Sequence, residues 1–91
     1  MHSHLSAHQD LDYTPCEVDA RDATCNDKHM PAEALLRRLR DQTKTPAKYS
    51  QIFQILWKRA EDKDYFWHVL KALNVVEYLM MTNVYTMIII E

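Results

Sequence analysis

The sequence contains no glycine and only three prolines in 91 residues. Its apolar residues recur every three to four positions, as they do on one face of a helix, and do not alternate as in a strand. Tight hairpin turns usually need glycine, so its absence argues against a sheet protein. A chain of this length is enough for one small domain. The composition therefore predicts a single all-α domain.

Long apolar runs are missing as well. The longest, Met87–Ile90, is far shorter than the roughly 20 residues that a membrane-spanning helix needs. The N-terminus carries no apolar core of the length that a secretory signal needs. Cys16 and Cys25 are the only cysteines. With no signal peptide ahead of them, the favoured interpretation is two reduced thiols in a cytoplasmic protein.

The first 13 residues contain no lysine or arginine and show no apolar period. We expect residues 1–13 to form a disordered, histidine-rich polar tail. Its imidazoles at His2, His4 and His8 are metal ligands by residue type, but nothing in the sequence orients their rings. A mobile tail without a metal is therefore the favoured interpretation.

Four helices are predicted after this tail. Thr14 is a suitable N-cap, Pro15 suits the first helical position and Glu17 completes a capping box, so the first helix extends to about Thr24. The remaining helices are expected over residues 31–41, 46–60 and 65–81. Short links between consecutive helices favour an antiparallel stack, either a bundle or a right-handed solenoid.

The last two helices carry the widest apolar stripes. The stripe of the third helix is expected to consist of Tyr49, Ile52, Phe53, Leu56, Trp57 and Ala60. The fourth is expected to bury Phe66, Val69, Leu70, Leu73, Val76, Leu79 and Met80. The aromatic residues follow these stripes, so we interpret them as packing residues and expect no nucleic-acid partner. Residues 83–91 are expected to form a separate apolar tail after a domain spanning 14–82.

Charge is distributed unevenly along the chain, although the net charge is only −2. Residues 1–36 hold two cations and seven acids, whereas residues 37–71 hold nine cations and four acids. A local basic surface is therefore possible on a protein that is acidic overall.

Three blocks of sequence resemble the epsin N-terminal homology (ENTH) domain of clathrin adaptors. Residues 21–27 read Arg-Asp-Ala-Thr-Cys-Asn-Asp, similar to the family's Arg-Glu-Ala-Thr-Ser-Asn-Asp. Residues 56–59 read Leu-Trp-Lys-Arg, and residues 68–73 read His-Val-Leu-Lys-Ala-Leu, followed by Glu-Tyr-Leu at 77–79. The resemblance implies a right-handed superhelix of stacked antiparallel helices, of which the chain represents the N-terminal half.

The resemblance also implies a phosphoinositide-binding site. By position, the matching residues are Arg21, Asn26, Arg59, His68 and Lys71, with Lys63 as a weaker candidate. Arginine makes bidentate contacts to phosphate, and lysine supplies a point charge. Residues 68 and 71 are three apart, so they share a helix face. The family's basic N-terminal segment, which inserts into the bilayer, has no counterpart in residues 1–13.

The resemblance implies a peripheral membrane module that recognises phosphoinositide headgroups in endocytic or endosomal clathrin-adaptor traffic. Clathrin-adaptor machinery is the implied protein partner, and the implied location is cytoplasmic, on plasma membrane, endosomes or coated vesicles. The alternative is a helical protein-interaction scaffold, or a truncated fragment that binds no lipid. We expect neither an enzyme nor a cofactor, because no glycine-rich loop, metal signature or nucleophile matched to His68 is present.

Overall fold

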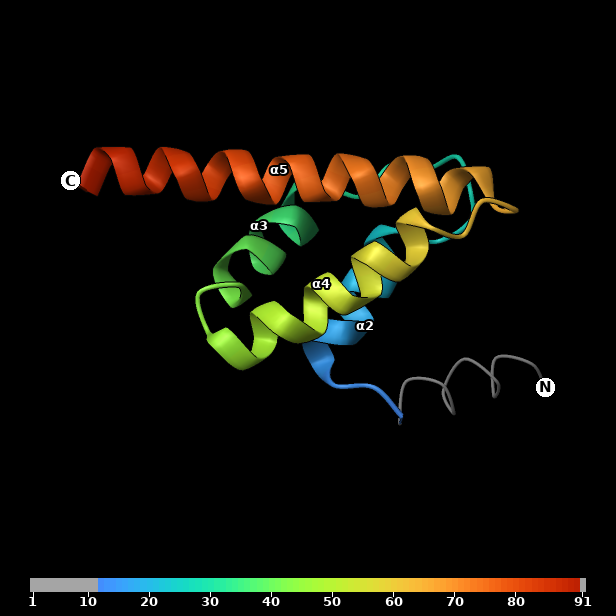
Figure 1. Cartoon of the computed structure of the whole chain (residues 1–91), viewed down its shortest axis with the longest axis horizontal. Helices are drawn as coiled ribbons and strands as arrows, with labels where there is room; N and C mark the ends of the chain where they lie inside the picture. The colour runs from blue at the N-terminus through green and yellow to red at the C-terminus, as the bar shows by residue number, and fades with distance from the viewer. Residues whose placement is uncertain (1–11, 91) are drawn as a thin grey trace.

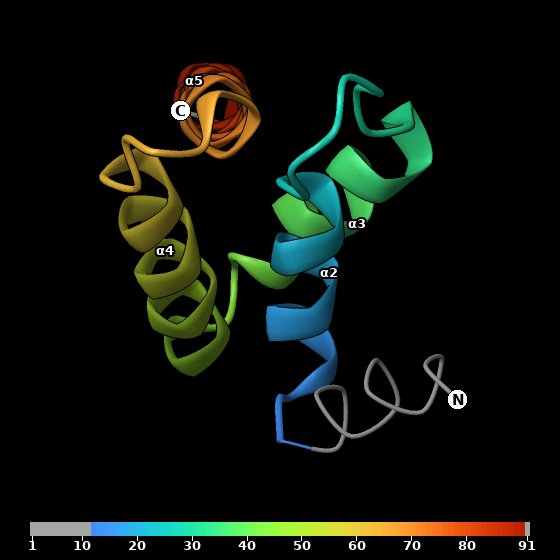
Figure 2. The ribbon, with the colours of Figure 1, turned by 90° about the vertical axis from the view of Figure 1, so that its right-hand side faces the viewer.

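The computed structural model describes residues 12–90, and their side chains as far as Asn83. The described part contains four α-helices: α2 (Pro15–Ala23), α3 (Glu33–Gln42), α4 (Pro46–Ala60) and α5 (Phe66–Ile90). Helix α5 lies along one side of the molecule, and α4 runs beneath it in the opposite sense (Figure 1). Viewed along α5, α4 stands on one side while α2 and α3 stand on the other (Figure 2). The predicted all-α stack is confirmed.

Helix α2 begins as its sequence predicts. The backbone N–H of Thr14 donates to the Glu17 carboxylate at 2.9 Å, and the Thr14 hydroxyl accepts from the Glu17 N–H at 3.4 Å. This reciprocal pair is the predicted capping box. Helix α4 also has its predicted bounds, although Thr45 makes no side-chain capping bond. Helix α3 starts at Glu33, two residues later than predicted.

The prediction that the last helix ends at Met81 was wrong, because α5 continues to Ile90. No glycine or proline lies within residues 66–90, so no residue of this stretch is a strong helix breaker. The Thr82 hydroxyl donates to the Tyr78 carbonyl oxygen at 2.8 Å, so this residue is accommodated within the helix. Residues 83–90 are therefore helical, whereas the domain boundary placed at 82 stays a prediction. The disorder expected of residues 1–13 stays a prediction, because residues 1–11 lie outside the described residues.

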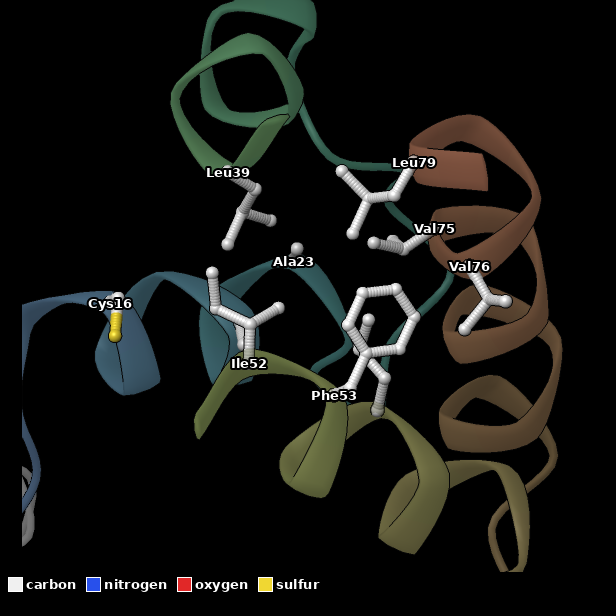
Figure 3. Packing of buried hydrophobic residues seen from close by; sticks show 10 residues of the cluster. Cys16, Ala23, Leu39, Ile52, Phe53, Val75, Val76 and Leu79 are labelled. Atoms are coloured by element: carbon white, nitrogen blue, oxygen red, sulfur yellow. The ribbon is translucent and has the colours of Figure 1, made fainter. Parts of the chain in front are cut away.

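The core lies where α2 and α3 meet α4 and α5 (Figure 3). Small residues line α2 here: Ala20 and Ala23 are fully buried, which lets α4 approach closely. In Figure 3 the ring of Phe53 points from α4 toward Val75 and Val76 on α5. The buried cluster consists of Cys16, Ala20, Ala23, Leu39, Ile52, Phe53, Leu56, Val75, Val76 and Leu79.

The predicted buried stripe of α5 was wrong in part. Val76 and Leu79 are buried as expected, but Phe66, Leu73 and Met80 are exposed. Trp57 of α4, expected in the core, is also half-exposed. The buried face of α5 is instead centred on Ala72, Val75, Val76 and Leu79, so the helix is rotated from the predicted orientation. The apolar stripe is wider than the surface that α3 and α4 cover.

Candidate functional site

The predicted site residues lie near one end of the molecule. Helices α2 and α4 both end there, α5 begins there, and the α2–α3 loop lies beside the first turns of α5 (Figure 2). Two cations bridge these elements: Arg59 of α4 reaches the end of α2, and Lys71 of α5 reaches the loop. Segments that are far apart in sequence therefore share one site.

Arg59 ties the end of α4 to the end of α2. Its Nη1 donates to the carbonyl oxygens of Thr24 at 3.0 Å and Arg21 at 3.4 Å, and to the Thr24 hydroxyl at 3.2 Å. The last carbonyls of a helix lack helical partners and carry its negative dipole end, so a cation is stabilised there. Burial, followed by the positive charge of Arg21, lowers the pKa of Arg59 from its ordinary value. The two guanidinium groups are thus close enough to repel.

Arg21 projects from the last turn of α2 and is partly buried. Its guanidinium lies over the ring of Tyr13, 4.3 Å from the centroid, and Nη1 donates to the Tyr13 hydroxyl at 3.3 Å. This cation–π contact holds the arginine beside Arg59. Sequence analysis missed it, because Tyr13 was assigned to the N-terminal tail.

Lys71 is 1% exposed, although lysine is seldom buried unless it is paired. Its Nζ donates to the backbone oxygen and to Oδ1 of Asp27, both at 3.2 Å, and lies 3.6 Å from the Cys25 sulfur. The lysine thus fastens the α2–α3 loop to α5. Its ammonium group already has an anionic partner.

Asp27 is the acid that neutralises this lysine. It accepts from the Cys25 thiol at 3.1 Å, from the backbone N–H of His29 at 2.8 Å and from Lys71. These donors, the thiol first, lower the pKa of Asp27 to about 2. Burial and the neighbouring carboxylate raise the pKa of the Cys25 thiol, so it is not an activated nucleophile.

His68 lies one turn before Lys71 on α5 and has a carboxylate partner of its own. Its Nδ1 is 3.1 Å from Oδ2 of Asp62 in the α4–α5 elbow, and its side chain is 16% exposed. The ring of Tyr65 tilts against the imidazole with 5.2 Å between centroids. No periodic signal predicts this pairing, because residues 62 and 68 lie on either side of a turn.

The structure brings some predicted residues together and not others. Arg21 and Arg59 are neighbours, and Lys71 holds the loop that carries Asn26. Asn26 and Lys63 are exposed, and among the described residues no side-chain contact joins Lys63 to the other five. The sequence signal identified the basic residues, but it did not identify Asp27 and Asp62, the carboxylates that pair with Lys71 and His68.

This arrangement is suited to binding an anion with several negative charges. Two adjacent guanidinium groups repel, so a phosphate between them would relieve that repulsion and accept charge-assisted hydrogen bonds. A second phosphate group could replace the carboxylates that now pair with Lys71 and His68. The chemistry is electrostatic and needs no covalent step.

Comparison with known proteins identifies the family of this chain. The family described as ENTH domain matches residues 13–88. The chain belongs to the ENTH family. Epsin-2 of Rattus norvegicus is 37% identical over 72 residues, which cover 78% of this chain and 12% of epsin-2. Human epsin-1 is 36% identical over the same length and similar shares.

Solved ENTH structures share the fold. The ENTH domain from epsin-2 in complex with phosphatidylinositol 4,5-bisphosphate matches with a TM-score of 0.71 and 37% identity, over 74% of this chain and 48% of that chain. The endocytic adaptor complex AENTH matches with a TM-score of 0.76 and 32% identity, over 85% of this chain and 54% of that one. This ENTH chain therefore spans about half the length of the solved structures.

Family membership settles the general class of this chain. ENTH domains are non-enzymatic adaptor domains, which confirms the prediction that the chain is not an enzyme. Within residues 12–90, no helix combines the length and the apolar character needed to cross a bilayer.

Proposed function

We propose that this ENTH chain binds phosphoinositide headgroups and associates peripherally with membranes during clathrin-mediated endocytosis or endosomal vesicle traffic. The observation that carries the proposal is the pair of neighbouring arginines, Arg21 and Arg59, at the end of α2. The ENTH domain of epsin-2, whose complex contains phosphatidylinositol 4,5-bisphosphate, supports the choice of ligand. Clathrin-adaptor machinery on plasma membrane, endosomes or coated vesicles is the corresponding setting.

In the proposed mechanism, one headgroup phosphate binds between Arg21 and Arg59. A second competes with Asp27 for the Lys71 ammonium, and His68 exchanges its Asp62 contact for a phosphate oxygen. Asn26, on the exposed loop, donates from its amide, and Lys63 adds positive charge at the elbow. Each exchange at Lys71 and His68 replaces a carboxylate by a phosphate of greater charge. Because the attraction is electrostatic, binding weakens as added salt screens the charges.

Vesicle co-sedimentation tests this proposal. The site variant is Arg21→Gln combined with Lys63→Gln, and the control is Arg37→Gln combined with Lys44→Gln, which removes the same charge from exposed positions on or just after α3. Vesicles contain either phosphatidylinositol 4,5-bisphosphate or phosphatidylserine at matched surface charge. We avoid Arg59 and Lys71 as first choices because both hold the fold together.

The parent and the control variant should prefer phosphoinositide vesicles, whereas the site variant should lose about tenfold or more in affinity, since hydrogen bonds to charged groups contribute roughly 1.5–3 kcal/mol. Equal loss in both variants would show non-specific attraction. Equal binding of the parent to both vesicle types would favour the alternative, a protein-interaction scaffold without lipid binding, which the exposed apolar face of α5 also supports.

A further inference from the structure

Tyr13 places a hydroxyl group against the arginine pair of the candidate site. Its oxygen accepts from Nη1 of Arg21 at 3.3 Å, and the Arg21 guanidinium lies 4.3 Å from the centre of its ring. The pKa of Arg59 is lowered mainly by burial and then by Arg21, and Tyr13 is close enough for a negative charge on it to oppose that shift. A group attached to the Tyr13 oxygen therefore lies beside both arginines.

The place of Tyr13 in the chain also suits enzymatic modification. It precedes α2 and is only partly buried, and the ribbon before α2 leads away from the other helices (Figure 1, Figure 2). Within the described residues, the hydrogen bond and the ring contact of its side chain are both with Arg21. Kinases bind the segment around their target in an extended form. Tyr49, Tyr78 and Tyr85 lie within helices, which would have to unwind first.

Tyr65 is the other tyrosine outside the helices, and its surroundings differ. It immediately precedes α5, and its ring contacts the imidazole of His68 with 5.2 Å between centroids. Among the described residues, no hydrogen bond joins its hydroxyl to an arginine. Both tyrosines directly follow an aspartate, so the local charge does not separate them. The arginine contact therefore singles out Tyr13.

We propose that Tyr13 is a phosphorylation site, and that its phosphate occupies the arginine pair in place of a phosphoinositide headgroup. In the modifying step, the Tyr13 oxygen attacks the γ-phosphorus of ATP bound to a tyrosine kinase. The new O–P bond forms as the bond to the β–γ bridging oxygen breaks, ADP leaves, and the catalytic base of the kinase takes the hydroxyl proton. The regulatory part rests on the proposed function, because it requires that a headgroup binds between Arg21 and Arg59.

A phosphate on Tyr13 is a stronger partner for these arginines than the hydroxyl is. It carries a charge of about −1.5 to −2 at pH 7 and three acceptor oxygens. The oxygen that carries it is already 3.3 Å from Arg21, so charge-assisted hydrogen bonds form without rearranging α2. Because the phosphate belongs to the same chain, its effective concentration at the site is high. A headgroup must displace it, so phosphorylation weakens lipid binding.

The contact within the chain is tested first, without lipid. Ligation at Cys25 joins a synthetic peptide of residues 1–24, with phosphotyrosine at position 13, to residues 25–91 and leaves the sequence unchanged. Phosphorus NMR then follows the titration of the phosphate. Guanidinium groups stabilise its dianion, so its pKa should lie about one pH unit below that of the same phosphoprotein carrying Arg21→Gln. Equal pKa values in the two proteins would overturn the proposal.

Vesicle co-sedimentation tests the competition. Binding to vesicles with phosphatidylinositol 4,5-bisphosphate should weaken about tenfold when Tyr13 is phosphorylated. The control carries its phosphate one residue away, at an exposed position, through Asp12→phosphotyrosine combined with Tyr13→Phe, and should lose much less. Equal weakening of both phosphoproteins, or none at position 13, would overturn the proposal. An unmodified chain with no preference for these vesicles would refute the proposed function and the competition with it. The lipid-free titration tells that outcome from a phosphate that misses the arginines.

The modification itself is tested on the folded full chain, with a broad-specificity tyrosine kinase domain and ATP. Mass spectrometry should find phosphate chiefly on Tyr13, and Tyr13→Phe should remain largely unmodified. Arg21→Gln should be phosphorylated faster, because it releases the hydroxyl from its hydrogen bond. A chain without phosphate on Tyr13, wherever else phosphate is found, would overturn the assignment of this site.

Discussion

The hydroxyl of Thr24 connects the end of α2 to Arg59, and removing it should cost stability out of proportion to its size. Thr24 is fully buried, its hydroxyl donates to the Ala20 carbonyl oxygen at 2.7 Å, and it accepts from Arg59 at 3.2 Å. Thr24→Val keeps the volume and the branched shape, so no cavity forms. What is lost is the hydroxyl that donates to the Ala20 carbonyl oxygen and that serves as one acceptor for a partly buried guanidinium.

The expected cost follows from the charge on the donor. A hydrogen bond to a charged group contributes roughly 1.5–3 kcal/mol, and Arg59 keeps its two carbonyl acceptors, so we expect a loss of about 2 kcal/mol. For a domain of this size that corresponds to a fall in Tm of roughly 8–16 °C. Thr24→Ser, which keeps the hydroxyl but loses a methyl group, should cost only about 1 kcal/mol.

Urea unfolding followed by circular dichroism measures both variants. The comparison is extended by Arg59→Met alone and in combination with Thr24→Val. If the hydrogen bond carries the effect, Thr24→Val should cost much less in the Arg59→Met background than in the parent. Equal costs in the two backgrounds, or a Thr24→Ser variant less stable than Thr24→Val, would refute the reasoning.

Two further predictions concern the α2–α3 loop. The pKa of Asp27, about 2, lies below its unfolded value, so its stabilisation is complete above about pH 4 and is lost as the pH falls toward 2; the urea midpoint should fall across that window, and less steeply in Asp27→Asn. The raised pKa of Cys25 predicts slow reaction with a disulfide reagent near pH 8, and Asp27→Asn should accelerate it by removing the carboxylate that accepts the thiol proton. A pH profile shared by both proteins would contradict the first prediction, and unchanged labelling the second.

The sequence predicted most of the helices and none of the ion pairs. The bounds of α4 and the capping box of α2 follow from local rules, because proline and threonine act within one turn. The end of α5 and its exposed face do not follow from local rules, because they depend on which neighbouring helices cover the apolar stripe of α5. Asp27 and Asp62 pair with Lys71 and His68 across loops, where spacing carries no periodic signal.

The candidate cations could be identified only through the ENTH resemblance. The sequence did not predict how deeply each cation is buried or which groups lie next to it. From its residue type, a lysine at position 71 would be expected on the exposed face of its helix. It is instead 1% exposed, because the α2–α3 loop folds over it. The sequence shows that Arg21 and Arg59 are basic. Their proximity depends on how α4 crosses α2.

Long-range anchoring of the α2–α3 loop has a consequence for folding. Thr24 and Arg59 are 35 residues apart, and Asp27 and Lys71 are 44 apart, so the loop acquires its shape only after α4 and α5 have docked. Closing such long chain segments slows folding and makes it cooperative. Amide hydrogen exchange at His29, whose N–H bonds to Asp27, should therefore report opening of the whole stack.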